Sequence, residues 1–243
     1  MLPLIIATLA FVTALLSGMF GMAGGLVLMA FLAVLLPVAT AMMLHGALQA
    51  TANGYRAWLN RNDIRWSIVG RYSAGAVAAL ALALAIAWIP SKRAVLLILG
   101  AIPFVASAMP ARFALDVMRP GVAPVCGFFV TLLQLLAGVA GALLDVFFVR
   151  TTLTRHEVVA TKAVTQTISH LIKLGFFFLL TQFDGAMLPW WLLLATLPLT
   201  VAGTNLGKMI LDRMQDSQFR QYSKWLTWCI GAISLWRGFT LPA

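Results

Sequence analysis

The sequence predicts an all-α, polytopic integral membrane protein built from two inverted repeats. Of its 243 residues, 62% are hydrophobic and only 10% are charged, whereas soluble domains average about 45–50% apolar and about 25% charged residues. The mean hydropathy is +0.96. A helical pattern of polar residues also occurs twice along the chain. Together these observations indicate membrane-spanning helices and one internal duplication.

The chain begins with an apolar stretch, residues 3–36, that glycines interrupt. Four of the eight residues from 18 to 25 are glycine, and each glycine disfavours a helix by about 1 kcal/mol relative to alanine. Two interpretations fit this stretch: one long, kinked span, or two short legs that turn back as a re-entrant hairpin. Broken backbone at membrane depth needs protein or a water-filled cavity around it.

The remaining apolar stretches divide into two sets. Three spans complete the first repeat, which we place at residues 1–109: 39–59, 67–89, and 94–109 with a kink at Pro103. The second repeat, residues 110–243, contains an apolar stretch at 122–137, a glycine break at 138–141, a short apolar piece at 145–149, and spans at 158–181, 188–206 and 225–239. The two repeats form one membrane domain.

The positive charges favour one of the two interpretations. If both glycine breaks are hairpins, one side of the membrane holds twelve Lys and Arg residues and the other holds three. If every segment crosses, this bias nearly disappears, so the excess of Lys and Arg in cytoplasmic loops favours hairpins. Each repeat is then a glycine-broken hairpin plus three transmembrane helices, and this odd number of crossings inverts the second repeat. The twelve Lys and Arg residues on the more positive side would be Arg56, Arg61, Arg65, Arg71, Arg112, Arg119, Arg150, Arg155, Lys208, Arg213, Arg220 and Lys224.

The span 39–59 carries a narrow polar stripe. At 100° per residue, its four members fall within about 80° of one another. Polar groups are costly in hydrocarbon, so the stripe must face protein or water. The members are His45, Gln49, Asn53 and Arg56, and 117 residues later the stripe recurs as Lys162, Gln166, His170 and Lys173. Two such spans predict a polar site between the halves.

Glycine-rich motifs follow one another in a fixed order along the chain. They are Ser17-Gly-Met-Phe-Gly21-Met-Ala-Gly24-Gly25 before Ala39-Thr-Ala, Gly138-Val-Ala-Gly141 before Val159-Ala-Thr161, and Gly203-Thr-Asn-Leu-Gly207 before a basic loop. Their order and duplication resemble the sulfite exporter TauE/SafE family of membrane transporters over most of the chain. The sequence departs from the family pattern at Ala23, where a third glycine is usual, and at Leu143-Leu-Asp145 after the second break.

The resemblance implies a function and a location. It implies a multi-pass protein of a bacterial inner membrane that exports a small sulfur-containing anion, such as sulfite or an organosulfonate like sulfoacetate. We therefore expect a secondary transporter that works by alternating access, with one half rocking against the other around a site near the midplane. Two alternatives remain: a passive anion channel with the same polar lining, and a non-transporting membrane assembly subunit.

Two sets of residues are candidates for binding the anion. Gln, Asn, Ser, Thr and His side chains can donate hydrogen bonds to oxyanions, and glycines at a helix break allow backbone N–H groups to approach an anion closely. The alternative is that these residues only join helices, as small and polar residues do in membrane bundles. The candidate residues are Gly21, Gly24, Gly25, His45, Gln49, Asn53, Thr165, Gln166, Ser169 and His170.

Charged and titratable residues within the spans suggest proton coupling. The candidates are Asp145, His45 and His170, because intramembrane acids and histidines often carry protons. Asp145 either pairs with a lysine or takes up a proton during transport. Lys162 is expected to extend toward the inner surface and Lys173 toward the outer surface, as long basic side chains do near helix ends.

Other classes of protein are disfavoured. The sequence lacks G-x-S-x-G, H-E-x-x-H, C-x-x-C and Walker A motifs, so no enzymatic activity and no cofactor are expected. The three histidines are too dispersed for a metal site. The net charge of +10 is explained by retention of positive charge on the cytoplasmic side rather than by nucleic acid. The expected partners are a small anion and the lipid bilayer, and a homo-oligomer is compatible with the sequence.

Overall fold

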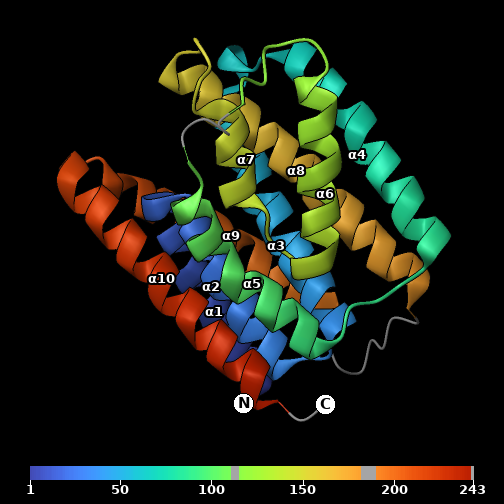
Figure 1. The fold of residues 1–243 in the computed structure, drawn as a ribbon. Helices are drawn as coiled ribbons and strands as arrows, with labels where there is room; N and C mark the ends of the chain where they lie inside the picture. The colour runs from blue at the N-terminus through green and yellow to red at the C-terminus, as the bar shows by residue number, and fades with distance from the viewer. Residues whose placement is uncertain (111–114, 182–189, 242–243) are drawn as a thin grey trace.

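The computed structural model describes residues 1–110, 115–181 and 190–241, which form helices and no strand. The prediction of an all-α protein is confirmed. Figure 1 shows α3 and α8 in the middle of the bundle, with the other helices around them. The helices are α1 (Leu2–Phe20), α2 (Met22–Leu35), α3 (Val38–Leu59), η1 (Arg61–Asp63), α4 (Trp66–Ile86), α5 (Lys92–Ala108), α6 (Val122–Ala137), α7 (Gly141–Phe148), α8 (Arg155–Leu180), α9 (Trp190–Leu211) and α10 (Asp216–Thr240).

Several helices are suited to a bilayer. By length and composition, α1, α4 and α8 can each cross a membrane, while residues Ala23–Leu35 and α6 are shorter apolar helices. The more polar helices α3 and α9 have 22 residues each, which corresponds to about 33 Å at 1.5 Å per residue. That length is sufficient for a hydrocarbon core of about 30 Å. The chain is therefore a polytopic membrane protein.

The first glycine break is a hairpin and not a kink in one long helix. Gly21 ends α1 with a φ of 63°, a backbone conformation that glycine adopts without strain. Gly24, in the first turn of α2, lies so close to the backbone of Thr13 and Ser17 that a Cβ would collide with it. In a continuous helix Ser17 and Thr13 would lie about two and about three turns from Gly24 along the axis. Helix α2 therefore runs back along α1.

The second break is also a hairpin. Gly138 ends α6 with a φ of 81°, and α7 begins three residues later. The backbone N–H groups of Leu115 and Val117, which precede α6, donate to the carbonyls of Val146 and Phe147 at 3.0 and 2.9 Å. The end of α7 thus returns to the start of α6. Its helix begins at Gly141 rather than near Asp145, so the returning leg is longer than the sequence suggested.

Helix contacts repeat between the two halves when α1–α5 are matched in order with α6–α10. Helix α1 packs along α9, and α6 packs along α4 in the same way; α3 packs on α8, and α5 on α10. The α5–α10 contact joins Gly100 to Gly231, which occupy matching helices. This exchange of partners is what two related halves would produce, and an inverted relation between them stays a prediction.

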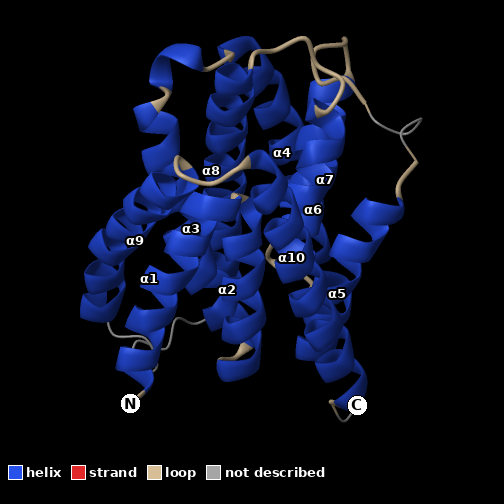
Figure 2. Cartoon of the chain, turned by 90° about the vertical axis from the view of Figure 1, so that its left-hand side faces the viewer, coloured by secondary structure: helices blue, strands red, loops and turns tan. Residues whose placement is uncertain are grey.

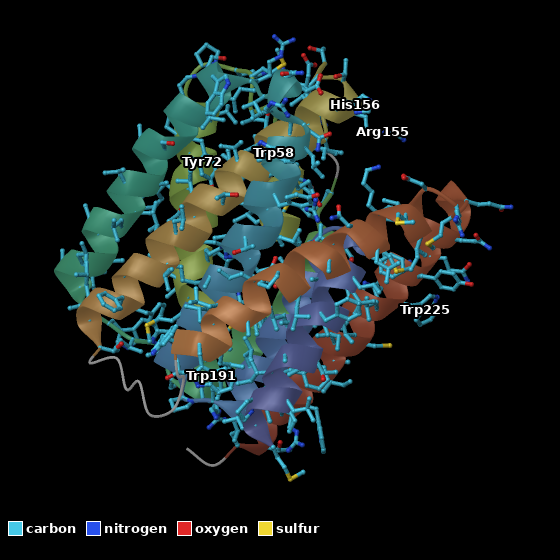
Figure 3. All side chains as sticks on the ribbon, turned by 180° about the vertical axis from the view of Figure 1, so that it is seen from behind. Trp58, Tyr72, Arg155, His156, Trp191 and Trp225 are labelled. Atoms are coloured by element: carbon cyan, nitrogen blue, oxygen red, sulfur yellow. The ribbon has the colours of Figure 1, made fainter. Side chains whose placement is uncertain are left out.

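The two ends of the bundle differ. In Figure 2 both chain termini lie at the same end, which we call the terminal end. Lys92 at the start of α5 donates to the Val34 carbonyl near the end of α2 at 3.2 Å there. Figure 3 places Trp58, Arg155 and His156 at the opposite end and Trp191 toward the terminal end. Arg155 and the ion pair between Arg65 and Glu157 lie at this opposite end, which we call the arginine-rich end.

Some predicted boundaries were wrong. Helix α10 begins at Asp216, nine residues before the predicted start at 225, because a capping box of Gln215 and Gln218 starts the helix within the basic segment. The predicted start of α9 at residue 188 lies outside the described residues, as does Arg112 from the charge count, and the side chain of Arg220 is not described. The other predicted spans agree with α3, α4, α5, α6 and α8 to within about three residues.

Candidate functional site

A small polar cavity lies where the two hairpins meet the central helices α3 and α8. Its volume is about 20 Å³, which is room for about one water molecule. Its wall is formed by the two hairpins, α1–α2 and α6–α7, near their glycine breaks, and by the helices α3 and α8. We call it the central cavity. Its lining residues are Ser17, Gly21, Gly25, His45, Gln49, Asn53, Arg56, Gln134, Val139, Ala140, Gly141, Gln166 and His170.

The polar stripe of α3 forms one wall of the central cavity. His45, Gln49 and Asn53 are all buried, and the Gln49 side chain lies against Gly25 so closely that a Cβ there would be 3.2 Å from Oε1. Asn53 Nδ2 donates to the Gln49 carbonyl at 2.9 Å. The helix-wheel prediction that these residues face protein or a polar space, and not lipid, agrees with this arrangement.

The first hairpin brings a helix end and a cation to the same wall. Arg56 donates to the Ser17 carbonyl at 3.0 Å and to Asn53 Oδ1 at 3.3 Å, so its guanidinium covers the last turn of α1 and reaches the cavity. Helix α2 starts directly after Gly21. The first N–H groups of a helix have no partner within the helix and carry partial positive charge.

The second hairpin supplies an equivalent wall. Helix α7 starts at Gly141, and Ala140 and Gly141 both line the cavity. Gln134, one turn before the break, lines the same cavity and is 2% exposed. Two helix N-termini, one from each half, therefore begin at the wall of the central cavity, and partial positive charge at such positions favours an anion.

A hydrogen-bonded chain crosses the molecule behind this cavity. The Gly25 carbonyl lies 2.9 Å from His45 Nε2, and Lys173 Nζ lies 2.7 Å from His45 Nδ1 and 2.8 Å from the Gly138 carbonyl. The chain joins both glycine breaks through both central helices. Lys173 is fully buried, so the expectation that it extends to the outer surface was wrong: it finds two acceptors inside the protein instead.

Two polar atoms at the cavity have no protein partner. Within the described part of the chain, His170 Nδ1 and Gln134 Nε2 are buried and make no hydrogen bond. The His170 ring lies 5.4 Å from the His45 ring, centroid to centroid. Buried polar atoms without partners are uncommon in folded proteins, and both of these belong to residues that line the cavity. A ligand or water in the cavity would give them partners.

Three candidate residues lie away from the central cavity. Ser169 is bonded to Tyr72 at 2.7 Å and to Thr131 at 2.9 Å, in a buried cluster that joins α4, α6 and α8. Thr165 donates to the Lys162 carbonyl at 3.0 Å. Gly24 allows the close contact between α2 and α1. For these three, the alternative of helix-to-helix contact describes the structure better than ligand contact.

Asp145 forms an ion pair with Lys162. Of the two interpretations for Asp145, pairing with a lysine is the one present in the structure, and Lys162 therefore does not extend freely to the surface. The Asp145 side chain is 48% exposed, because it borders a second and larger cavity.

This larger cavity has a volume of about 590 Å³ and lies between α2, α5, α7 and α10. We call it the vestibule. It extends along α7 to Val149 and Arg150, toward the arginine-rich end, and it shares Val139 and Gly141 with the central cavity. The second glycine break is thus the wall between the two spaces.

The candidate residues predicted from the sequence did not include the lining residues Ser17, Arg56, Gln134, Val139, Ala140 and Gly141. One signal could have found several of them. The offset of 117 residues that relates the two stripes also relates Ser17 to Gln134, Gly21 to Gly138 and Gly24 to Gly141. Applied to the glycine breaks, the same offset would have added Gln134 and Gly141 to the candidates.

Membrane-spanning helices, two broken hairpins and a polar cavity between the halves define the architecture of a membrane transporter. The family model for the sulfite exporter TauE/SafE family matches residues 6–233. The chain belongs to this family, whose members are membrane transporters of sulfur-related anions. Neither the curated proteins nor the solved structures that were compared with the chain gave a match.

Proposed function

We propose that this protein is a secondary transporter that exports a small anion, a sulfur oxyanion or an organosulfonate of the sulfite or sulfoacetate kind, across a bacterial inner membrane. The proposed binding site is the central cavity. The protein groups that would contact the anion there are the side-chain amides of Gln49, Asn53, Gln134 and Gln166, the imidazole of His170, and the backbone N–H groups at the starts of α2 and α7.

The observation that carries this proposal is the charge of the cavity wall. The lining includes the guanidinium of Arg56, four side-chain amides and two helix N-termini, and no carboxylate among the described lining residues. A wall of hydrogen-bond donors that contains no carboxylate favours an oxyanion over a cation or a zwitterion. The unpartnered Nδ1 of His170 and Nε2 of Gln134 supply two further points of contact.

The shape of the two cavities supports alternating access rather than a channel. The central cavity holds about one water, so an oxyanion of four or more heavy atoms enters only when its walls separate. The vestibule approaches it from the arginine-rich end, and the residues around Val139 and Gly141 stand between the two. An anion would enter from the vestibule while this wall is open. It would be released toward the terminal end once this wall closes and the wall on the opposite side of the central cavity opens.

Flux measurements test the proposal. Purified protein in proteoliposomes should show saturable uptake of radiolabelled sulfate or sulfite, accelerated by unlabelled substrate on the far side. Gln49→Ala and Gln166→Ala should each reduce the rate at least about tenfold, since each removes a hydrogen bond to a charged ligand worth about 1.5–3 kcal/mol. Gln221→Ala, on an exposed side chain of α10, is the matched control.

Two results would contradict the proposal. Flux that rises linearly with concentration and does not exchange across the membrane would indicate a channel. Absence of both flux and anion-dependent thermal stabilisation, for sulfite, sulfoacetate, taurine and thiosulfate alike, would indicate an assembly subunit. Carboxylates of similar size serve as the comparison that separates selectivity for sulfur anions from general anion binding.

A further inference from the structure

Lys173 is a buried amine whose surroundings do not balance its charge. Its side chain is fully buried, and Gly46 in α3 leaves space for its stem: a Cβ at Gly46 would be 3.4 Å from Lys173 Cε. None of the ion pairs among the described residues includes Lys173. A buried ammonium without an opposite charge costs several kcal/mol.

The hydrogen bonds at Lys173 are those that a neutral amine can make. Because His45 Nε2 faces the Gly25 carbonyl, which only accepts, that nitrogen carries the ring hydrogen. His45 Nδ1 is then an acceptor, and so is the Gly138 carbonyl. A neutral amine has two N–H groups and fills both positions, whereas the third N–H of an ammonium needs another acceptor.

The groups that face Lys173 do not supply a negative charge. His45 faces it from α3, His170 lies one turn before it on α8, and the Gly138 carbonyl faces it from the second break. On α4 and α6, the Tyr72 and Thr131 hydroxyls are bonded to Ser169, one turn further away. Arg56, the other nearby cation, is bonded to Ser17 and lines the central cavity.

The central cavity supplies the missing charge only when an anion is bound in it. His45 lines the cavity and contacts Lys173 through its Nδ1, so one imidazole ring would separate the ammonium from the anion. At this separation in a medium of low dielectric, opposite charges interact strongly. An anion therefore stabilises the protonated form of Lys173, and by linkage a protonated Lys173 stabilises the bound anion.

We propose that Lys173 carries one proton across the membrane together with each transported anion. This inference rests on the function proposed above. When an anion enters the central cavity, the Lys173 amine binds one proton from water and becomes an ammonium. When the anion leaves on the other side, the ammonium releases the same proton there, so one anion and one proton cross together. His45 and His170 position and shield the amine without gaining a net proton.

Calorimetry on the full chain in detergent tests this coupling. Binding of sulfate and methanesulfonate, whose charges do not change near neutral pH, is measured in two buffers with different ionisation enthalpies. The difference gives the number of protons bound per anion. We expect close to one for the unaltered protein. Lys173→Arg should bind the anions without proton uptake, because an arginine stays protonated in both states.

Further variants keep the test decisive. Lys173→Met should lose the proton uptake and bind the anions at least about tenfold more weakly. This variant tests the role of Lys173 even if the arginine of Lys173→Arg does not fit in the buried site. Lys162→Met, on the same helix but paired with Asp145, should keep an uptake of one. His170→Gln should weaken binding through its lost contact and yet also keep an uptake of one.

The outcomes separate this inference from the proposed function. Anion binding without proton uptake in the unaltered protein overturns the role of Lys173 and leaves the anion site standing. Proton uptake that survives in Lys173→Arg and disappears in His170→Gln overturns it in favour of the imidazole. Absence of binding by either anion overturns both proposals.

Discussion

Lys173 Nζ lies 2.7 Å from His45 Nδ1, and this contact joins the two striped helices at the middle of the protein. Beyond each residue, the chain of hydrogen bonds ends on the carbonyl of a glycine: Gly25 on the His45 side and Gly138 on the Lys173 side. Elements from both halves are therefore held together at one point. The contact lies directly behind the cavity in which we place the anion.

His45→Ala should destabilise the protein. The change leaves the Gly25 carbonyl without its donor and Lys173 with one acceptor fewer, and each buried group left unpaired costs about 1–3 kcal/mol. The melting temperature of the purified protein should fall by several degrees. His156→Ala, at the exposed start of α8, should leave it unchanged. Equal melting temperatures for the two variants would mean that the His45 contacts contribute nothing to stability.

Gly25→Ala should weaken anion binding while the fold is retained. The new methyl group would be 3.2 Å from Gln49 Oε1, and this close contact should displace the Gln49 amide from its position at the cavity. A loss of about 1.4 kcal/mol, which is tenfold in affinity, is expected. Gly70→Ala on α4 meets nothing within 4 Å and should keep normal affinity. Anion titration followed by intrinsic fluorescence measures both, and equal affinities would remove Gln49 from the site.

Asp145→Asn should change both stability and coupling very little. The carboxylate is 48% exposed and its partner Lys162 is 19% exposed, and partly solvated pairs contribute about 0–1 kcal/mol. Since Lys173 is the proposed proton carrier, the variant should still move protons together with anions in proteoliposomes that contain a pH-sensitive dye. Anion flux that continues without proton movement would assign the coupling to Asp145 instead.

Gly75→Ala should be among the most damaging single changes. A Cβ at Gly75 would collide with the Pro124 carbonyl on α6, and overfilled contacts of this kind cost about 1–3 kcal/mol or more. Gly175→Ala on α8 meets nothing within 4 Å and should be neutral or stabilising by up to about 1 kcal/mol. The yield of monodisperse protein and its melting temperature compare the two, and a stable Gly75→Ala variant would contradict the close α4–α6 contact.

The sequence predicted most of the framework, because the cost of polar groups in lipid acts on each helix separately. The stripe of α3 could be assigned an inward direction from angular spacing alone, and His45, Gln49 and Asn53 do line the cavity. The two hairpins were favoured from the positions of Lys and Arg, and the contacts of Gly24 and Val117 are those of hairpins.

The details that the sequence did not predict depend on which partner lies across from a side chain. Neighbouring residues on a helix point about 100° apart, so Ser169 and His170 could not both face one cavity, and only His170 does. Lys173 was expected to extend outward on the basis of its depth alone. The decisive factor was an acceptor on another helix, His45 Nδ1, which one helix considered alone cannot reveal.

The glycine contacts between the halves have a mechanical consequence. Gly203 and Gly207 of α9 touch the backbone of α1, and Gly75 and Gly127 bring α4 and α6 equally close. Backbone surfaces in such contact cannot slide without collisions, so α1 must travel with α9, and α4 with α6. Each of these pairs takes one helix from each half of the chain. In the proposed transport cycle, each unit that shifts would therefore combine helices from both halves of the chain, and the boundary between the units would not follow the boundary between the halves.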